Sequence, residues 1–176
     1  MDVVDPCPVA SLLSRGGILY GVPAVDKMAA ITMAVERLSL PDGVNRDQVI
    51  EEILRRESIA STATGEGVAI PHPQNAPALG LPVSILALAF LAQPVDFDAP
   101  DGQPVHALFL LLSQNAGLHL RLLAHLGRTL QHADVRDALA RRLPAEELIA
   151  VFNRVEAAIS ARRAAAASVT PQPAVC

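Results

Sequence analysis

Aromatic residues are scarce in this chain of 176 residues, which contains four Phe, one Tyr and no Trp. Hydrophobic residues nevertheless make up 51% of the sequence, so the core must be built mostly from Leu, Val, Ile and Ala. A chain of this length is typical of one domain, and it is long enough to bury a single substantial core.

Long apolar runs and long basic runs are also missing. The longest apolar stretches, residues 83–92 and 105–112, are too short to cross a bilayer as helices. The formal net charge is −4 and no cluster of Lys and Arg is present, which argues against binding to DNA or RNA. No secretion leader opens the chain. We therefore expect a protein without membrane insertion and without a nucleic-acid partner.

Cysteine occurs only as Cys7 and Cys176, near opposite ends of the sequence. This placement argues against a disulfide framework, and the simplest interpretation is a reducing compartment, the cytoplasm. Neither cysteine has the local context of a nucleophile. The sequence also lacks a His-Glu-x-x-His motif and paired cysteine ligands, so we expect no catalytic metal and no other cofactor.

Hydrophobic spacing predicts helices at both ends of the chain and short strands between them. The predicted helices are residues 9–13, 26–38, 45–59, 117–132, 135–142 and 145–161, and the predicted strands are 67–71, 83–91 and 105–112. Residues 16–22 form either an irregular crossing or a further strand. This order is typical of an α/β domain in which helices cover a small sheet. We assign residues 1–8 to a flexible N-terminus, 9–163 to a single domain and 164–176 to a disordered tail.

The most informative segment is residues 56–72, Arg-Glu-Ser-Ile-Ala-Ser-Thr-Ala-Thr-Gly-Glu-Gly-Val-Ala-Ile-Pro-His. It combines a helix end, a turn rich in hydroxyl groups and glycine, and a short apolar strand that ends at His72. A histidine in this position is often a structural residue whose ring nitrogens bond to backbone or water. A rigid sheet edge can also present the imidazole as a nucleophile, because imidazole reacts well near neutral pH.

This segment resembles the active-site signature of the enzyme IIA components of the bacterial phosphotransferase system, in the fructose, mannitol and nitrogen-regulatory class. The residues in the order and spacing of that family are Arg56, Glu57, Ser61, Thr62, Gly65, Gly67, Ala69, Pro71 and His72. The resemblance continues through residues 88–97, 104–112 and 119–124, and extends from about Leu12 to about Val155. Ala60 replaces a usual glycine, and Pro73, which has no backbone N–H to donate, replaces a usual small residue.

The resemblance implies a single α/β domain with a small mixed sheet flanked by helices and an active site at one edge. It also implies that Nε2 of His72 accepts a phosphoryl group from the phosphohistidine of a small carrier, HPr. His119 matches the second active-site histidine of the family, which would donate a hydrogen bond to the phosphoryl oxygens. Helical spacing places His119 on an apolar stripe, where a core histidine bonded to a carbonyl is the alternative.

Arg56 is the third candidate, because a guanidinium offers a phosphoryl group bidentate hydrogen bonds. Its alternative role is that of a solvated residue at a helix end or a weak ion pair, and only the family register selects it over Arg55. The hydroxyls of Ser61 and Thr62 can bind phosphoryl oxygens or can cap the turn, and the sequence supports both roles equally.

The remaining histidines have ordinary sequence contexts. His106 lies near the start of an apolar strand, His125 is expected on the polar side of its helix, and His132 lies at that helix's end. Gly65 and Gly67 precede a strand and do not open a helix, which excludes a nucleotide-binding loop.

Three functional interpretations share this site. We favour a phosphocarrier of the nitrogen-regulatory type, in which the phosphorylation state of His72 controls the binding of a target protein. The preference rests on the expectation of a free-standing module, with no fused transport domain. The alternatives are a sugar-transport enzyme IIA that passes the phosphoryl group to a cysteine of a separate IIB component, and a binding module that is not phosphorylated. We expect an exposed apolar patch around His72 to dock these partners.

Overall fold

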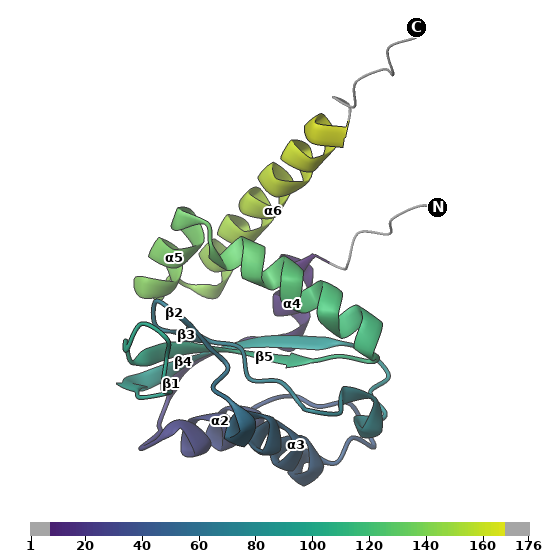
Figure 1. Ribbon diagram of the computed structural model, residues 1–176, viewed down its shortest axis with the longest axis vertical. Coiled ribbons are helices and arrows are strands. Elements are labelled where there is room, and N and C mark those ends of the chain that lie inside the picture. The colour runs from purple at the N-terminus through teal and green to yellow at the C-terminus, as the bar shows by residue number, and fades with distance from the viewer. Residues whose placement is uncertain (1–7, 168–176) are drawn as a thin grey trace, which may run out of the picture.

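The computed structural model describes residues 8–167, which form three layers with a sheet between two layers of helices (Figure 1). One layer contains α2 (Lys27–Glu36) and α3 (Arg46–Ile59), and the other contains α1 (Val9–Gly16), α4 (Ala116–Leu130), α5 (Ala133–Ala140) and α6 (Ala145–Ala167). The α/β architecture with one small domain is the one predicted from the sequence.

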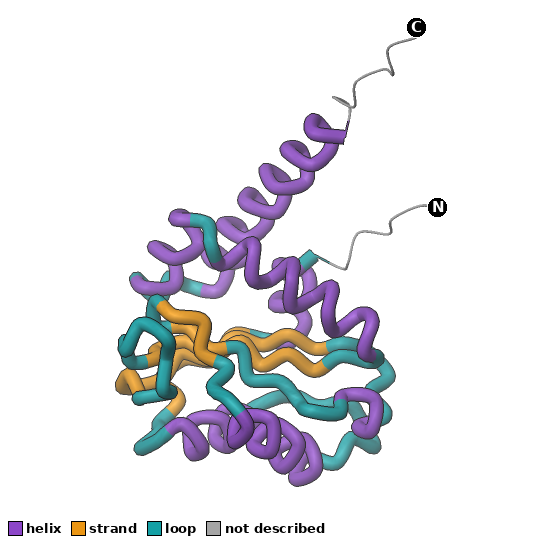
Figure 2. The backbone as a smooth tube through the Cα atoms, viewed as in Figure 1, coloured by secondary structure: helices purple, strands orange, loops and turns teal. Residues whose placement is uncertain are grey.

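The sheet has five strands in the order β1-β4-β5-β3-β2 (Figure 2). Their bounds are β1 Ile18–Val22, β2 Ala63–Gly65, β3 Val68–Ala69, β4 Ile85–Val95 and β5 Val105–Leu112. The pairs β1–β4 and β3–β5 are parallel, whereas β4–β5 and β2–β3 are antiparallel. The sheet is therefore mixed, and the predicted strands at 83–91 and 105–112 lie in its interior.

The two long strands are apolar on both faces because helices cover both faces of the sheet. Alternate side chains of β5 join different apolar clusters, one with α1, α4, α5 and α6 and the other with α2 and α3. The first set is Ala107, Phe109 and Leu111, and the second is Leu108, Leu110 and Leu112. Burying a large apolar side chain stabilises the fold by about 1.5–3 kcal/mol. These strands are therefore held firmly, and they fix the position of the loops at their ends.

Strand β2 is absent from the sequence prediction, which placed a turn there. Its small residues carry little strand signal. It pairs with β3 in a short antiparallel hairpin, which the backbone bond from the N–H of Ile70 to the carbonyl of Thr62 at 3.0 Å extends. The turn between β2 and β3 places Glu66 and Gly67 at φ of 53° and 76°. Glycine adopts such angles without steric cost.

Helix α6 is longer than predicted and its C-terminal part projects beyond the other helices (Figure 1). Residues 164–167 continue this helix instead of starting the expected disordered tail, because alanine is the best helix former. The other parts of the expected termini, residues 1–7 and 168–176, lie outside the described residues. Between residues 8 and 167, no helix is both long and apolar enough to cross a membrane.

Candidate functional site

His72 follows β3 at the point where this strand and the parallel strand β5 both end. The backbone stays paired beyond β3, since the N–H of Leu111 donates to the carbonyl of Pro71 at 3.1 Å. After β5 the chain passes Ser113 and enters α4, whose start is capped by Asn115 through a 2.9 Å bond from the N–H of Leu118. Ligand sites commonly form where the carboxyl ends of neighbouring strands meet the loops that follow.

The structure brings together the two histidines that the sequence singled out. The ring centroids of His72 and His119 lie 4.9 Å apart, with an angle of 49° between the ring planes. His119 reaches this position from the beginning of α4, where its backbone N–H bonds to the carbonyl of Asn115. Both rings are partly buried, so they are held by the fold and still reachable from solvent.

The hydrogen bond of His72 determines which of its ring nitrogens can react. Its Nδ1 lies 2.7 Å from the carbonyl oxygen of Ile70, and a carbonyl only accepts, so Nδ1 carries the proton. In the neutral ring Nε2 then has a free lone pair. No partner of Nε2 lies among residues 8–167, which makes this nitrogen the nucleophilic one.

Both rings are neutral near pH 7. Burial lowers the pKa of His72, the bond to the Ile70 carbonyl opposes this shift, and the positive charge of Arg56 lowers the pKa further. Burial lowers the pKa of His119 to about 4, with added contributions from His72 and Arg56. Desolvation disfavours the charged imidazolium, so His72 keeps its lone pair at physiological pH.

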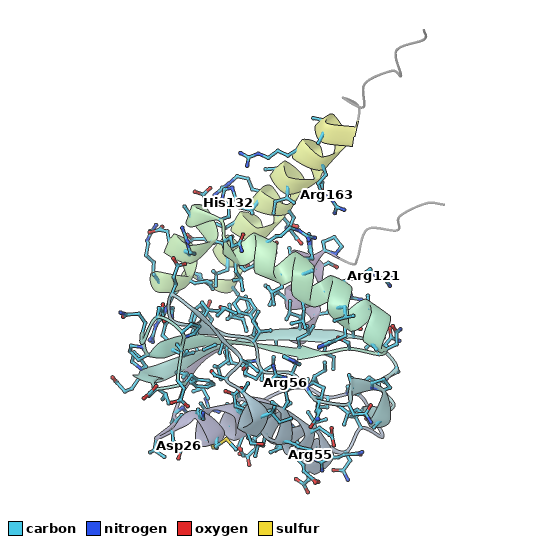
Figure 3. The ribbon with its side chains drawn as sticks, viewed as in Figure 1. Asp26, Arg55, Arg56, Arg121, His132 and Arg163 are labelled. Carbon is cyan, nitrogen blue, oxygen red and sulfur yellow. The ribbon has the colours of Figure 1, made fainter. Side chains whose placement is uncertain are left out.

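Arg56, and not Arg55, lies on the side of α3 that faces the sheet (Figure 3). Its Nη1 donates to the carbonyl of Ala60 at 2.8 Å, and within the described chain it has no ion pair. Arg55 lies on the outer side of α3, where it pairs with Glu51 at 2.7 Å and with Glu52 at 2.9 Å. Arg56 is therefore the arginine whose charge acts on the two histidines.

The two candidate hydroxyls both bond to protein acceptors. Thr62 donates from Oγ1 to the buried carboxylate of Glu57 at 2.6 Å, and its backbone N–H bonds to the same carboxylate at 3.2 Å. Ser61 donates from Oγ to the carbonyl of Phe97 and accepts from the N–H of Ala63 at 3.1 Å. A hydroxyl has one proton to donate, so this geometry corresponds to the turn-capping role.

Glu57 supports the turn that leads to the site. The sequence indicated this residue only as part of the motif, without a role of its own. Its side chain is 1% exposed, and its carboxylate holds the chain as it turns from α3 into β2. The spacing Val49, Ile53, Glu57 was the available signal, because residues four apart share a helix face and the first two are fully buried. A glutamate on such a face requires a buried donor.

The motif glycines serve packing away from His72. Gly67 lies in the turn just before β3, and a Cβ there would approach Cδ2 of His106 to 2.4 Å. The carbonyl of Gly67 also accepts from the backbone N–H of His106 at 2.8 Å. These contacts with His106 explain the need for glycine at position 67.

The loop after His72 is tied to α3. The N–H of Gln74 donates to the backbone carbonyl of Glu52 at 3.3 Å, and the N–H of Asn75 donates to the Glu52 carboxylate at 3.2 Å. Pro73 itself is buried and has no N–H. The first backbone N–H groups after His72, those of Gln74 and Asn75, therefore bond to α3.

His125 is buried at 6% exposure, so the prediction that it lies on the polar side of its helix is wrong. Its Nε2 donates to Oε1 of Glu156 at 2.5 Å, and the Glu156 carboxylate also accepts from the N–H groups of Val9 and Ala10. This cluster joins α1, α4 and α6. The polar partner lies on a distant helix, which local spacing does not reveal.

Among residues 8–167, no three His, Cys, Asp or Glu side chains are grouped so as to hold a metal ion. What the site offers is a neutral nucleophilic nitrogen, a second imidazole and a guanidinium. This combination suits a tetrahedral anion such as a phosphoryl group.

Comparison with known proteins agrees with this chemistry. Residues 11–155 match the family described as "Phosphoenolpyruvate-dependent sugar phosphotransferase system, EIIA 2". A nitrogen regulatory protein of Bradyrhizobium diazoefficiens is 34% identical over 150 residues, covering 82% of this chain and 94% of that protein. A fructose-specific EIIA component of Haloferax volcanii is 40% identical over 143 residues, covering 79% and 88%.

A solved structure extends the similarity to three dimensions. The crystal structure of the nitrogen regulatory protein IIA-Ntr from Neisseria meningitidis matches with a TM-score of 0.71 and 32% identity, covering 82% of this chain and 98% of that one. Because the family match spans most of the sequence, the chain belongs to the EIIA 2 family, a phosphotransferase component of the phosphoenolpyruvate-dependent sugar phosphotransferase system.

Proposed function

We propose that the protein is a phosphocarrier that accepts a phosphoryl group on Nε2 of His72 from a phosphohistidine of an HPr-type protein. The observation that carries this proposal is the bond from Nδ1 of His72 to the Ile70 carbonyl, which leaves Nε2 as the free nitrogen beside His119. The Nε2 lone pair attacks phosphorus while the donor's P–N bond breaks. A donor ring with a proton on its other nitrogen leaves as neutral imidazole, and His72 keeps its Nδ1–H.

His119 and Arg56 stabilise the group during transfer. The His119 ring donates a hydrogen bond to a phosphoryl oxygen, and Arg56 supplies positive charge and paired N–H donors. The predicted phosphoryl-binding role of Ser61 and Thr62 would require each hydroxyl to leave its present acceptor. We therefore assign these two residues to the support of the turn.

We infer that the output is regulatory, because nitrogen regulatory proteins match along most of their length both in sequence and in a solved structure. A phosphoryl dianion on His72 would change the charge around the site, and the two helices that supply Arg56 and His119 each carry an exposed apolar side chain nearby in the sequence. Ile59, 64% exposed, lies in the last turn of α3, and Leu120, 68% exposed, follows His119. Such a site suits a target protein whose binding depends on phosphorylation. The proposal places this exchange in the cytoplasm, together with the phosphoryl donor.

A second candidate is transport of a sugar, in which His72 passes the phosphoryl group to a cysteine of a separate IIB component. The fructose-specific relative favours it. The two functions share the first step and differ in the acceptor. A binding module without phosphorylation is the remaining alternative.

The test of the first step is incubation with phosphoenolpyruvate, enzyme I and HPr, followed by intact-mass measurement at mildly alkaline pH. Wild-type protein should gain one acid-labile phosphate, and His72→Ala should gain none. His132→Gln, a change at the start of α5 beyond the C-terminal end of α4, serves as the control and should be phosphorylated normally. An unlabelled but folded wild type, with a known enzyme IIA labelled in parallel, would favour the binding module.

The second step separates regulation from transport. Phosphorylated protein is mixed with a purified fructose-type IIB domain, and both masses are followed. Retention of the phosphate supports the regulatory output, whereas its rapid appearance on the IIB cysteine supports transport.

A further inference from the structure

Ser113 is the one side chain that holds the ring of His119 in the described structure. It lies directly after β5, is fully buried at 0% exposure, and places Oγ 3.1 Å from Nδ1 of His119. Nε2 of His119, like that of His72, has no hydrogen-bond partner among residues 8–167. The bond from Ser113 to Nδ1 therefore influences whether Nε2, the nitrogen that is free to contact a phosphoryl group, carries the ring proton.

The proton of this hydrogen bond can lie on Oγ of Ser113 or on Nδ1 of His119. The need of the buried Ser113 hydroxyl for an acceptor decides between the two arrangements. If Nδ1 carried the proton, Ser113 would accept it, and its own O–H would have no acceptor within the described chain. A buried donor without a partner costs about 1–3 kcal/mol. If Ser113 donates to Nδ1, its proton is satisfied and the proton of the neutral ring resides on Nε2.

The position of that proton has a direct consequence for phosphoryl binding. A neutral imidazole has one N–H, and the pKa of His119, about 4, keeps the ring neutral near pH 7. With the proton on Nε2 the ring donates to a phosphoryl oxygen. With the proton on Nδ1 it would present a lone pair to a dianion, which is repulsive.

We propose that Ser113 is a positioning residue that holds His119 in the Nε2–H tautomer, so that this ring donates a hydrogen bond to the phosphoryl group on His72. The proposal rests on the phosphorylation of His72 proposed above. Ser113 acts through His119 and does not itself contact the phosphoryl group.

The first test reads the tautomer and requires no phosphoryl transfer. Long-range ¹H–¹⁵N spectra of unphosphorylated, histidine-labelled protein at about pH 7 are assigned with His119→Gln. We expect His119 to be protonated on Nε2 in wild type and in Ser113→Thr, which keeps the hydroxyl. In Ser113→Ala both nitrogens should shift toward values averaged between tautomers. A proton on Nδ1 in wild type, or an unchanged spectrum in Ser113→Ala, overturns the proposal.

The second test reads the rate of transfer from phospho-HPr. Ser113→Ala should slow transfer about tenfold, the equivalent of one hydrogen bond of about 1.4 kcal/mol. Ser113→Thr should recover most of that loss. Ser84→Ala is the matched control, because Ser84 accepts from the N–H of Gln114 in the same loop without touching His119. Its rate should equal that of wild type.

A double-mutant cycle separates positioning from general support of the loop. In a His119→Gln background, Ser113→Ala should have no further effect on the rate, because the ring on which Ser113 acts is gone. An undiminished tenfold loss in that background would overturn the proposal. If wild-type protein accepts no phosphate, the function proposed for His72 fails, and the tautomer spectra decide the assignment of Ser113 by themselves.

Discussion

The hydroxyl of Thr62 donates to the buried carboxylate of Glu57 at 2.6 Å, five residues back along the chain. This bond closes the turn that follows α3 and fixes the helix end from which Arg56 approaches the two histidines. The position of the guanidinium is thus set by a side-chain contact that does not itself touch the site.

Loss of that bond should reduce stability and slow transfer. Thr62→Val leaves a buried carboxylate short of one donor, which should lower the free energy of unfolding by about 1–3 kcal/mol. Urea unfolding measures the change. Ser58→Ala removes an exposed hydroxyl near the end of the same helix and should change stability by less than about 0.5 kcal/mol. Equal effects of the two substitutions would contradict the support role of Glu57.

Arg56 and Arg55 should differ sharply in their effect on transfer. Arg56→Ala removes charge-assisted hydrogen bonds worth about 1.5–3 kcal/mol, so transfer from phospho-HPr should slow by about 10–100-fold. Arg55→Ala should leave the rate unchanged, because the Arg55 side chain lies on the outer side of α3 and pairs with Glu51 and Glu52, away from the two histidines (Figure 3). Rapid-quench measurement of both variants checks this, and a slow Arg55→Ala with a fast Arg56→Ala would reverse the assignment.

The lowered pKa of His119 predicts a loss of stability in acid. Between pH 6.5 and about 4 the unfolded chain binds a proton at this residue that the folded chain does not. Stability therefore falls as the pH falls through this window, and the contribution of His119 levels off below about pH 4. Urea unfolding at several pH values should show a shallower decline in His119→Gln than in wild type. Parallel pH profiles for the two proteins would contradict the assigned shift.

Glu156 should be essential for the packing of α1, α4 and α6. Glu156→Ala removes the acceptor of His125 and of the N–H groups of Val9 and Ala10, so it should destabilise the fold by about 3–5 kcal/mol. Thermal and urea unfolding provide the measurement. Glu36→Ala, at an exposed position in α2, is the charge-matched control and should cost less than about 0.5 kcal/mol. A Glu156→Ala variant whose free energy of unfolding is close to that of wild type would contradict this role of Glu156.

The central features of the fold were predictable because they follow local rules. Apolar runs marked β4 and β5. The predicted helices 26–38 and 45–59 begin at Asp26 and Asn45, the residues whose side chains cap α2 and α3. The pairing of His72 with His119 followed from the family motif and from the helical position of His119.

The remaining features depend on side-chain contacts and strand pairing that residue patterns do not reveal. β2 exists through pairing that its own residues do not signal. Burial of His125 depends on Glu156, which lies 31 residues further along the chain. Ser113 carries no motif, and its bond to His119 depends on how the loop after β5 enters α4. Local patterns encode such tertiary contacts poorly.

The most direct test of phosphorylation at His72 locates the phosphoryl group within the modified protein. Wild-type protein labelled with ¹⁵N in its histidines is phosphorylated through HPr, and the ring nitrogens are assigned at mildly alkaline pH. We expect a single phosphoryl group on Nε2 of His72, with Nδ1 still protonated and bonded to the Ile70 carbonyl. A phosphoryl group on Nδ1 of His72, or on any other histidine, would contradict it.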